Sequence, residues 1–349
     1  MNYKKVAVIV YTLLHFFVDF TTVFLISGIL LGPTVGIVSR GEVIIAYNLI
    51  AFAGQLPIGI IADMVNKNRF IVIIGCALAC IAYPISQVSP WLACVLAALG
   101  NGAFHIGAGT DILKMSMPKA GPSGLFVSSG AFGVWLAYKA PINIAAWLCP
   151  VLMLVGIVLI IITNKNYKVE EKNTAIRFDQ PECVTILAVS CFMFTIVIRS
   201  LLGMVMNFSW KAVSMISLLS VMAVVGGKAL GGFLGDRFGY IKTAMISLGI
   251  SLILFTFSID NWIAGIVAIL CFNMTMHLTL TAIAGVCKQK YGFAFGLTTF
   301  ALAIGFLPVV FGADRLFGVP LLICGVLVSL ILMVLGYLLL AKMKNKCGR

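Results

Sequence analysis

The sequence predicts an all-α integral membrane protein, with twelve transmembrane helices arranged as two six-helix, pseudo-symmetric bundles. Of its 349 residues, 62% are hydrophobic and 10% are charged, whereas soluble domains average about 45–50% and about 25%. Apolar runs long enough to cross a bilayer recur along the whole length. Short motifs also repeat at an offset of 172 or 173 residues. These observations exclude water-soluble, disordered, coiled-coil and disulfide-scaffold classes.

The apolar runs between turn and charge signals define the expected spans. About 20 residues at about 1.5 Å per residue cross a hydrocarbon core that is about 30 Å thick. The first run has no small-residue cleavage site and carries ionisable residues, so we expect it to remain as the first helix and not to be a signal peptide. The expected spans are 6–31, 42–62, 70–88, 91–112, 121–140, 142–163, 183–206, 211–235, 241–259, 262–283, 292–313 and 318–341.

The basic residues separate sharply between alternate loops. Eighteen Lys and Arg fall on one side and four on the other, while Arg199 and Lys228 fall within spans. Because Lys and Arg are retained on the cytoplasmic side, we expect a multi-pass protein of the cytoplasmic membrane with both termini in the cytoplasm. The net charge of +13 is then a consequence of topology, and the expected partner is the lipid bilayer, with no nucleic acid.

The longest polar stretch divides the chain near its middle. It predicts an N-terminal bundle at 1–164, a cytoplasmic loop at 165–182 and a C-terminal bundle at 183–349. Internal repetition supports this division, because Asn101 and His105 recur as Asn273 and His277 at equivalent places in the second half. A constant offset across several matches indicates a duplicated unit, and six plus six parallel repeats is typical of transporters.

A second repeated motif lies between expected spans two and three and again between spans eight and nine. It reads Gly59-Ile-Ile-Ala-Asp63-Met-Val-Asn-Lys67 and then Gly232-Phe-Leu-Gly-Asp236-Arg237-Phe-Gly239. Glycines permit close helix approach, an aspartate can accept hydrogen bonds from a helix N-terminus, and the basic residues can form ion pairs. We therefore expect a cytoplasmic gate made of Gly59, Asp63, Lys67, Asp111, Gly232, Asp236, Arg237 and Gly239.

This motif resembles the G-x-L-x-D-R-x-G-R/K signature of the major facilitator superfamily, in both places where that family carries it. The second copy is nearly complete, whereas the first has Met64 and Asn66 where Arg and Gly are usual. The resemblance covers essentially the whole chain. It implies a transporter whose first, fourth, seventh and tenth spans line a central cavity.

A closer resemblance, to the fosmidomycin-resistance-like group, rests on His15-Phe-Phe-Val-Asp19 and on Asn101-Gly-Ala-Phe-His105. It implies proton-coupled export of a drug or metabolite. Two features depart from that pattern: the fourth span contains no Arg, and the fifth lacks the Gly-Pro step of antiporters. The direction of transport and the coupling ion therefore stay open.

Ionisable and amide side chains inside the expected spans are candidates for binding the substrate or a proton. Asp19 lies roughly 20 Å into the span and His15 one turn before it on the same face, and such residues in a membrane interior are functional by default. For each, a fixed structural contact is the competing interpretation. Arg199 would attract an anion, pair with Asp19 or extend to the outer surface. The full set is His15, Asp19, Asn101, His105, Arg199, Asn273 and His277.

The leading hypothesis is a secondary active transporter of a small organic solute, which we expect to be a monomer coupled to H⁺. The alternatives are an uptake permease or uniporter without proton coupling, and a membrane enzyme that uses the intramembrane His and Asp groups. A substrate-sensing receptor ranks third, because the loops are too short for a signalling domain. The sequence has no P-loop, HExxH or zinc-ligand spacing, so we expect no catalytic residue, cofactor or metal and no enzyme activity.

Overall fold

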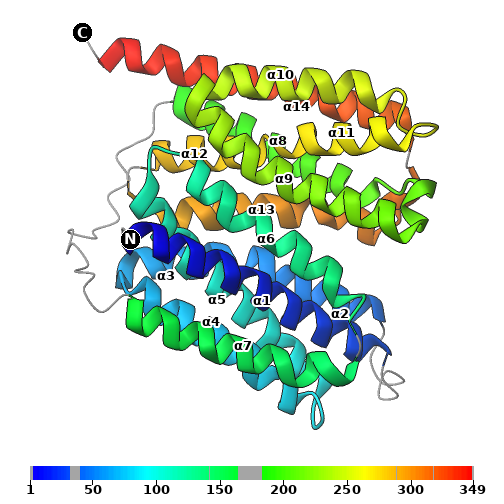
Figure 1. Ribbon diagram of the computed structural model, residues 1–349. Coiled ribbons are helices and arrows are strands. Elements are labelled where there is room, and N and C mark those ends of the chain that lie inside the picture. Colours follow the sequence, from blue (N-terminus) through cyan, green and yellow to red (C-terminus); the bar gives the residue numbers. More distant parts are fainter. Residues whose placement is uncertain are drawn as a thin grey trace. The chain divides into compact units, whose positions relative to one another are not determined.

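The computed structural model describes residues 3–31, 40–140, 142–163, 183–287, 289–316 and 318–347. The expected loop at 165–182 lies outside these ranges. Helices joined by short turns make up the described chain (Figure 1). They are α1 (Tyr3–Leu31), α2 (Arg40–Asn48), the π-helix η2 (Leu49–Ala53), α3 (Gln55–Val65), α4 (Asn68–Ile85), α5 (Pro90–Ser116), α6 (Gly121–Ala137), α7 (Ile142–Thr163), α8 (Cys183–Val205), the short 3₁₀ helix η3 (Ser209–Ala212), α9 (Ser214–Phe238), α10 (Tyr240–Phe255), α11 (Trp262–Asn273), α12 (Met276–Val286), α13 (Tyr291–Val310), the short 3₁₀ helix η4 (Ala313–Leu316) and α14 (Val319–Cys347).

Helix occupies each of the twelve expected spans, and the expected all-α architecture is confirmed. Nine helical stretches of the described chain are long and apolar enough to cross a membrane, and α10 and the second part of α7 are shorter apolar helices. Two expected spans are not single α-helices. The second contains the π-helix η2 between α2 and α3, and the tenth is divided into α11 and α12.

The backbone interruption in the tenth span lies beside two candidate site residues. Helix α11 ends at Asn273 and α12 begins at Met276. The Asn273 amide donates to the Ile269 carbonyl at 2.8 Å, and the Thr275 hydroxyl donates to the Phe272 carbonyl. Such side-chain bonds compete with the backbone hydrogen bonds of the helix and favour a break at this point. Apolar periodicity does not register these bonds, so the sequence predicted one continuous helix.

Contacts between Cα atoms divide the chain into two units. The first contains Met1–Met115, Leu125–Thr174 and Lys290–Phe300, and the second contains Ser116–Gly124, Ala175–Gln289 and Ala301–Arg349. The start of α13 therefore belongs to the first unit, and the start of α6 belongs to the second. The bundle boundaries expected from the sequence remain a prediction.

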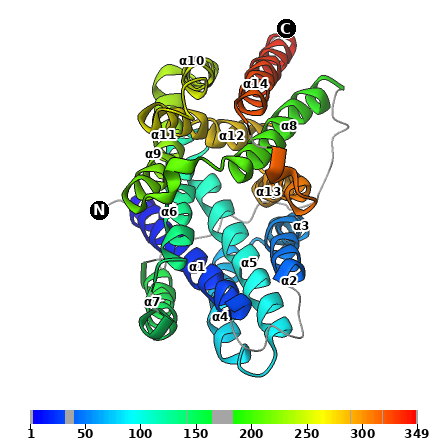
Figure 2. The ribbon, with the colours of Figure 1, turned by 90° about the vertical axis from the view of Figure 1, so that its right-hand side faces the viewer.

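In the first unit, α1, α4 and α7 pack side by side, as both ribbon views show (Figures 1 and 2). Small side chains let α4 and α5 cross closely: a Cβ on Gly100 would lie 2.7 Å from the backbone N of Ala79 and 2.8 Å from the backbone O of Gly75. Cys94, Ala97 and Ala98 are fully buried on the same helix. This tight packing fixes the position of α5, which carries Asn101 and His105.

A branched side chain at Gly100 is expected to separate these two helices. We predict that Gly100→Val lowers the free energy of unfolding by about 2 kcal/mol or more, because overpacking against backbone atoms cannot be relieved by rotating a side chain. Thermal denaturation of the purified protein in detergent measures the effect. The control is Gly249→Val on α10, where an added Cβ would meet no atom within 4 Å; equal melting temperatures of the two variants would contradict the prediction.

In the second unit, α14 packs against α8 and α10, and α11 packs against α9 and α10. Gly231 of α9 has no side chain to keep it away from the backbone of Met274, and a Cβ there would collide with the Met274 carbonyl. Helix α9 therefore lies directly against the interruption between α11 and α12.

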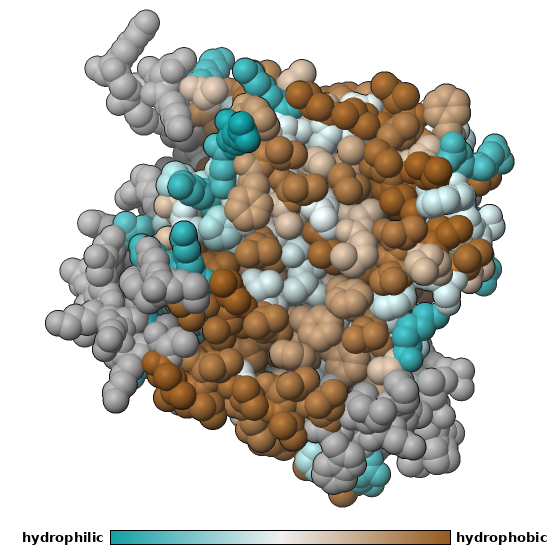
Figure 3. Space-filling model, in the orientation of Figure 1, coloured by the Kyte–Doolittle hydropathy of each residue, from teal (hydrophilic) through white to brown (hydrophobic). Residues whose placement is uncertain are grey.

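Large apolar side chains are exposed on the outer faces of the helices. Hydrophobic residues cover much of the face shown in Figure 3. In the first unit, α7 exposes Leu154, Val158 and Ile162, and in the second unit α10 exposes Ile246 and Ile253. Exposure to water would cost about 25 cal/mol per Å² of such surface, whereas lipid tails cover it without this cost. These faces are suited to contact with lipid.

Candidate functional site

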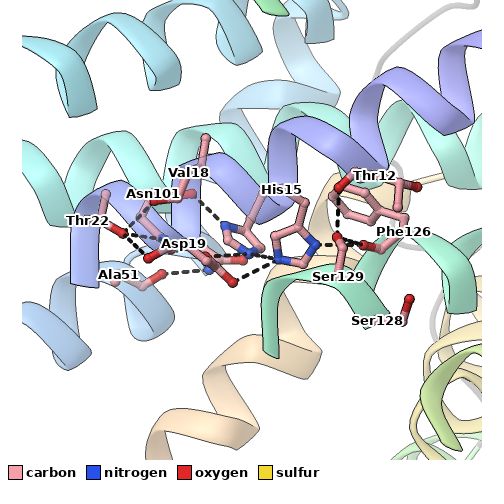
Figure 4. A network of polar contacts seen from close by, with 12 residues as sticks. Thr12, His15, Val18, Asp19, Thr22, Ala51, Asn101, Phe126, Ser128 and Ser129 are labelled. Atoms are coloured by element: carbon pink, nitrogen blue, oxygen red, sulfur yellow. Dashed lines mark hydrogen bonds and ion pairs between the residues drawn. The ribbon is translucent and has the colours of Figure 1, made fainter. Parts of the chain in front are cut away.

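Two helices of the first unit bring four of the expected site residues together. His15 and Asp19 lie one turn apart on α1, and Asn101 and His105 lie one turn apart on α5; we call these four residues the His–Asp cluster. Figure 4 labels His15, Asp19 and Asn101. The Nε2 atom of His15 is 3.1 Å from Oδ2 of Asp19, and Nε2 of His105 is 3.6 Å from Oδ1. The side chain of His15 is 2% exposed, whereas those of His105 and Asp19 are 12% and 15% exposed. His15 is therefore buried, whereas His105 and Asp19 are partly accessible.

Backbone carbonyl groups fix the orientation of both imidazole rings. Nδ1 of His15 lies 2.7 Å from the carbonyl O of Phe126, and Nδ1 of His105 lies 2.8 Å from the carbonyl O of Asn101. A carbonyl oxygen only accepts hydrogen bonds, so each Nδ1 carries a hydrogen. Both Nε2 atoms are then left with their lone pairs directed into the cluster.

The two Nε2 atoms lie 2.7 Å from each other. Two lone pairs repel at this distance, and a cation held between them converts the repulsion into attraction. The Asp19 carboxylate beside both rings supplies the balancing negative charge. The arrangement therefore has the donor atoms and the charge to bind one cation.

Further polar groups hold the carboxylate in place. The Asn101 amide donates to Oδ1 of Asp19 at 2.9 Å and to the Thr22 hydroxyl at 3.2 Å. The hydroxyl of Tyr47, on α2, donates to the same Thr22 oxygen at 2.9 Å. Figure 4 shows Thr22, Asn101 and Asp19 in one continuous network. Sequence reasoning did not include Thr22 or Tyr47, because a hydroxyl in an apolar run gives no sign of where its helix will pack.

A glycine of α6 closes the cluster on its buried side. A Cβ on Gly130 would collide with Oδ2 of Asp19 and Nε2 of His15. The next turn of the same helix is also tightly packed, because a Cβ on Gly133 would collide with the backbone O of Phe16. Only a residue without a side chain fits at position 130 while the carboxylate and the imidazole keep their positions.

The first copy of the gate motif forms hydrogen bonds with the start of another helix of the first unit. The Asp63 carboxylate accepts hydrogen bonds from the backbone N of Gly292 at 2.8 Å and of Phe293 at 2.7 Å, at the N-terminus of α13. Two backbone N–H groups and the positive end of the helix dipole stabilise this negative charge. Gly59 lies one turn away, and its Cβ would collide with the Gly292 carbonyl, so the glycine permits the approach.

The second gate motif makes the same arrangement in the second unit. The Asp236 carboxylate accepts hydrogen bonds at 2.8 Å from the backbone N of Ala120 and of Gly121, at the start of α6. Gly232 takes the role of Gly59, since its Cβ would lie 2.6 Å from the backbone O of Ala120. Tyr240 reinforces the contact, because its hydroxyl donates to the Pro118 carbonyl and lies 3.1 Å from Oδ1 of Asp236. The repeat in sequence is thus also a repeat in hydrogen bonding.

Each motif ends its helix with a residue at positive φ. Gly239 has φ +94°, and Asn66, which stands where the signature usually has Gly, has φ +53° and ψ +31°. Asn tolerates the left-handed conformation better than most residues, so the helix stop is kept despite the substitution. The side chain of Asn66 also accepts a hydrogen bond from Nζ of Lys114 at 2.6 Å.

The remaining gate candidates have different surroundings. Lys67 and Arg237 are exposed, and the Arg237 guanidinium lies 5.3 Å from the ring centroid of Phe238. Asp111, on α5, is the last of the expected gate residues. Its buried carboxylate accepts hydrogen bonds from the Tyr11 hydroxyl at 2.8 Å and from the Asn68 amide at 2.7 Å.

The candidates of the second unit lie beside the interruption of the tenth span and on α8. His277 is fully buried, with its ring 3.4 Å from the position of a Cβ on Gly124. Asn273 uses its amide N within its own helix. Arg199 is 7% exposed, and its Nη1 has no hydrogen-bond partner within the described part of the chain. The structure thus gathers the first-half candidates into one cluster, whereas the second-half candidates lie on α8, α11 and α12.

No protein-family model matches the sequence, and no curated protein matches it. Solved structures do match over nearly the whole chain. The human organic anion transporter MFSD10 (TETRAN) has a TM-score of 0.67 at 12% identity, covering 95% of this chain and 99% of its own. The E. coli fucose:proton symporter FucP has a TM-score of 0.62 at 13% identity, covering 97% and 99%. A bacterial homologue of the iron transporter ferroportin has a TM-score of 0.63 at 15% identity, covering 99% and 100%.

The fold and the duplicated gate motif define a polytopic, two-repeat helical membrane protein. More particularly, the chain has the fold of the major facilitator superfamily, as the sequence predicted, and the solved structures named above are described as transporters. At these identities the likeness establishes the fold alone.

Proposed function

We propose that this protein is a secondary active transporter that moves a small organic solute across the cytoplasmic membrane by alternating access. The proposal rests mainly on one repeated arrangement: Asp63 in one unit and Asp236 in the other each accept two backbone hydrogen bonds from the start of a helix. Catalysis in a membrane enzyme does not require two equivalent gates. A transporter that opens alternately to each side must form and break the contacts of its gates in turn.

The proposal extends to the family and to the energy source. It places the chain in the major facilitator superfamily, near the fosmidomycin-resistance-like group, with both termini in the cytoplasm. It includes coupling to H⁺ and export of a drug or metabolite. A proton is the smallest cation that fits between the Nε2 atoms of His15 and His105 next to the Asp19 carboxylate, and one of the solved structures with this fold is described as a proton symporter.

The remaining candidates are assigned to the solute. Arg199 is a buried cation whose Nη1 lacks a hydrogen-bond partner in the described chain, and burying a charge without a partner is costly. An anionic group on the solute would supply that partner, and a structural neighbour is described as an organic anion transporter. Asn273 and His277 flank the interruption of the tenth span and would contribute polar contacts to the same solute.

The test is transport by the purified protein in sealed proteoliposomes. Candidate organic anions and antibiotics are offered with and without an imposed pH gradient, after a thermal-shift screen has identified those that stabilise the protein. We expect net flux of at least one such solute and faster flux with the gradient. Chemical conversion of the solute without net flux would contradict the proposal and favour the enzyme alternative, and flux that ignores the gradient would favour a uniporter.

A further inference from the structure

We propose that His15, His105 and Asp19 form a binding site for a divalent transition-metal ion of the Zn²⁺ and Co²⁺ type. This inference goes beyond the proposed function, because it concerns a ligand other than the transported solute and does not require transport. The three side chains offer one donor atom each, and these atoms all lie within 4.8 Å of one another. No other group of three or more His, Cys, Asp or Glu donors in the described residues converges in this way.

The donor set is one that first-row transition metals prefer. Imidazole nitrogen suits Zn²⁺, Co²⁺, Fe²⁺ and Ni²⁺, and two imidazoles with one carboxylate make a three-ligand site that leaves at least one position open. The partial exposure of His105 and Asp19 places that open position on the accessible side of the cluster. A water molecule or another small donor would complete the coordination there.

The distances are close to those that such an ion requires. With bonds of about 2.0–2.1 Å to nitrogen and about 2.0–2.2 Å to oxygen, tetrahedral donor atoms lie roughly 3.3 Å apart. The two nitrogen–oxygen distances are 3.1 Å and 3.6 Å, and the nitrogen–nitrogen distance is 2.7 Å. The imidazole rings need to separate by only about 0.6 Å to admit the ion.

The groups around the three donors are also those of a metal site. Metal-binding histidines typically donate the hydrogen of their other ring nitrogen to a carbonyl or carboxylate, which fixes the ring and strengthens the ligand. Both histidines do so here, to Phe126 and to Asn101. The Asn101 amide in turn fixes the carboxylate by donating to Oδ1. Both Nε2 lone pairs are therefore directed at one point before any ion arrives.

The test is a Co²⁺ titration of the purified, tag-free full chain in detergent, followed by visible absorption. We expect one equivalent of Co²⁺ with the d–d bands of a nitrogen and oxygen environment, displaced by Zn²⁺. Variants H15Q, H105Q and D19N are each expected to weaken binding at least tenfold, because they keep a polar side chain but remove a ligand. The chain has three histidines, so H277Q is the matched control, and it should bind Co²⁺ as the wild type does.

A second pair of variants tests the position of the ion without removing a ligand. Gly130→Ala places a methyl group against Asp19 and His15, whereas Gly133→Ala meets the Phe16 backbone one turn away. We expect Gly130→Ala to weaken Co²⁺ binding at least tenfold. Because a shift of the Phe16 backbone would also move His15 and Asp19, the control is Gly249→Ala, where an added Cβ meets no atom within 4 Å. This control should bind Co²⁺ within threefold of wild type, provided that both variants elute as monodisperse protein.

Several outcomes would overturn the site. They are wild-type affinity in H105Q, loss of binding in H277Q, a thiolate-to-cobalt charge-transfer band that assigns the ion to cysteine, or no saturable binding. If Co²⁺ binds as expected and the proteoliposomes show no flux, the metal site stands and the transport proposal fails. If flux occurs and no Co²⁺ binds, only the metal site fails.

Discussion

Replacing Asp236 with Asn is expected to reduce solute flux at least tenfold while leaving the protein folded. The carboxylate accepts hydrogen bonds from two successive backbone N–H groups, those of Ala120 and Gly121. An amide keeps one acceptor oxygen, and it loses both the second bond and the negative charge at the helix N-terminus, at a cost of about 2–3 kcal/mol to the captured state. Flux into proteoliposomes measures the change, together with the melting temperature and the elution profile.

Asp63→Asn is expected to act in the same way, because its hydrogen bonds to Gly292 and Phe293 are equivalent. The matched control is Asp260→Asn, which alters an exposed carboxylate in the turn after α10 and should transport like the wild type. Wild-type flux in both Asp236→Asn and Asp63→Asn would show that the captures hold the fold together without acting as gates.

Replacing Asp19 with Asn is expected to abolish accumulation of the solute against its gradient. The substitution keeps the size of the side chain and removes the carboxylate that lies next to both His15 and His105. Without that negative charge, a cation between the two Nε2 atoms is no longer balanced in a buried site. Exchange of labelled for unlabelled solute across the same vesicles should remain measurable, because exchange needs no net movement of the coupling ion.

Comparing the two assays in one preparation separates coupling from binding. Loss of both accumulation and exchange would assign Asp19 to the solute or to folding. Retention of accumulation with an unchanged pH dependence would remove Asp19 as the site of the coupling proton.

Much of this structure follows from short-range information. The spans were predictable because apolar length and turn signals are properties of local sequence. Helix is confirmed in each of the twelve spans, although two of them are interrupted. The capture of a helix start by Asp63 or Asp236 was predictable in kind, since the repeated motif ends each span with a carboxylate. The sequence could not predict which backbone N–H groups each carboxylate would bind, because Gly292 is 229 residues from Asp63 along the chain.

The His–Asp cluster shows the same limit. His15 and Asp19 share a helical face by spacing alone, and both were candidates. Their convergence with His105 depends on how α1 packs on α5, with 90 residues between the two imidazoles. A search for local ligand spacing therefore finds no metal site. The contact of Gly130 with the cluster could not be predicted either. A glycine in an apolar helix is interpreted as ordinary helix packing until the side chain opposite it is known.

The hydrogen bond between Asn66 and Lys114 distinguishes the two copies of the repeated motif. Gly239 ends its helix and offers no side chain, whereas Asn66 ends the equivalent helix and also binds Lys114 near the C-terminus of α5. Replacing Asn66 with Gly would keep a residue that can end the helix and would remove the hydrogen bond to Lys114. Exchanging equivalent residues between the two copies of the motif therefore changes the contacts of α5.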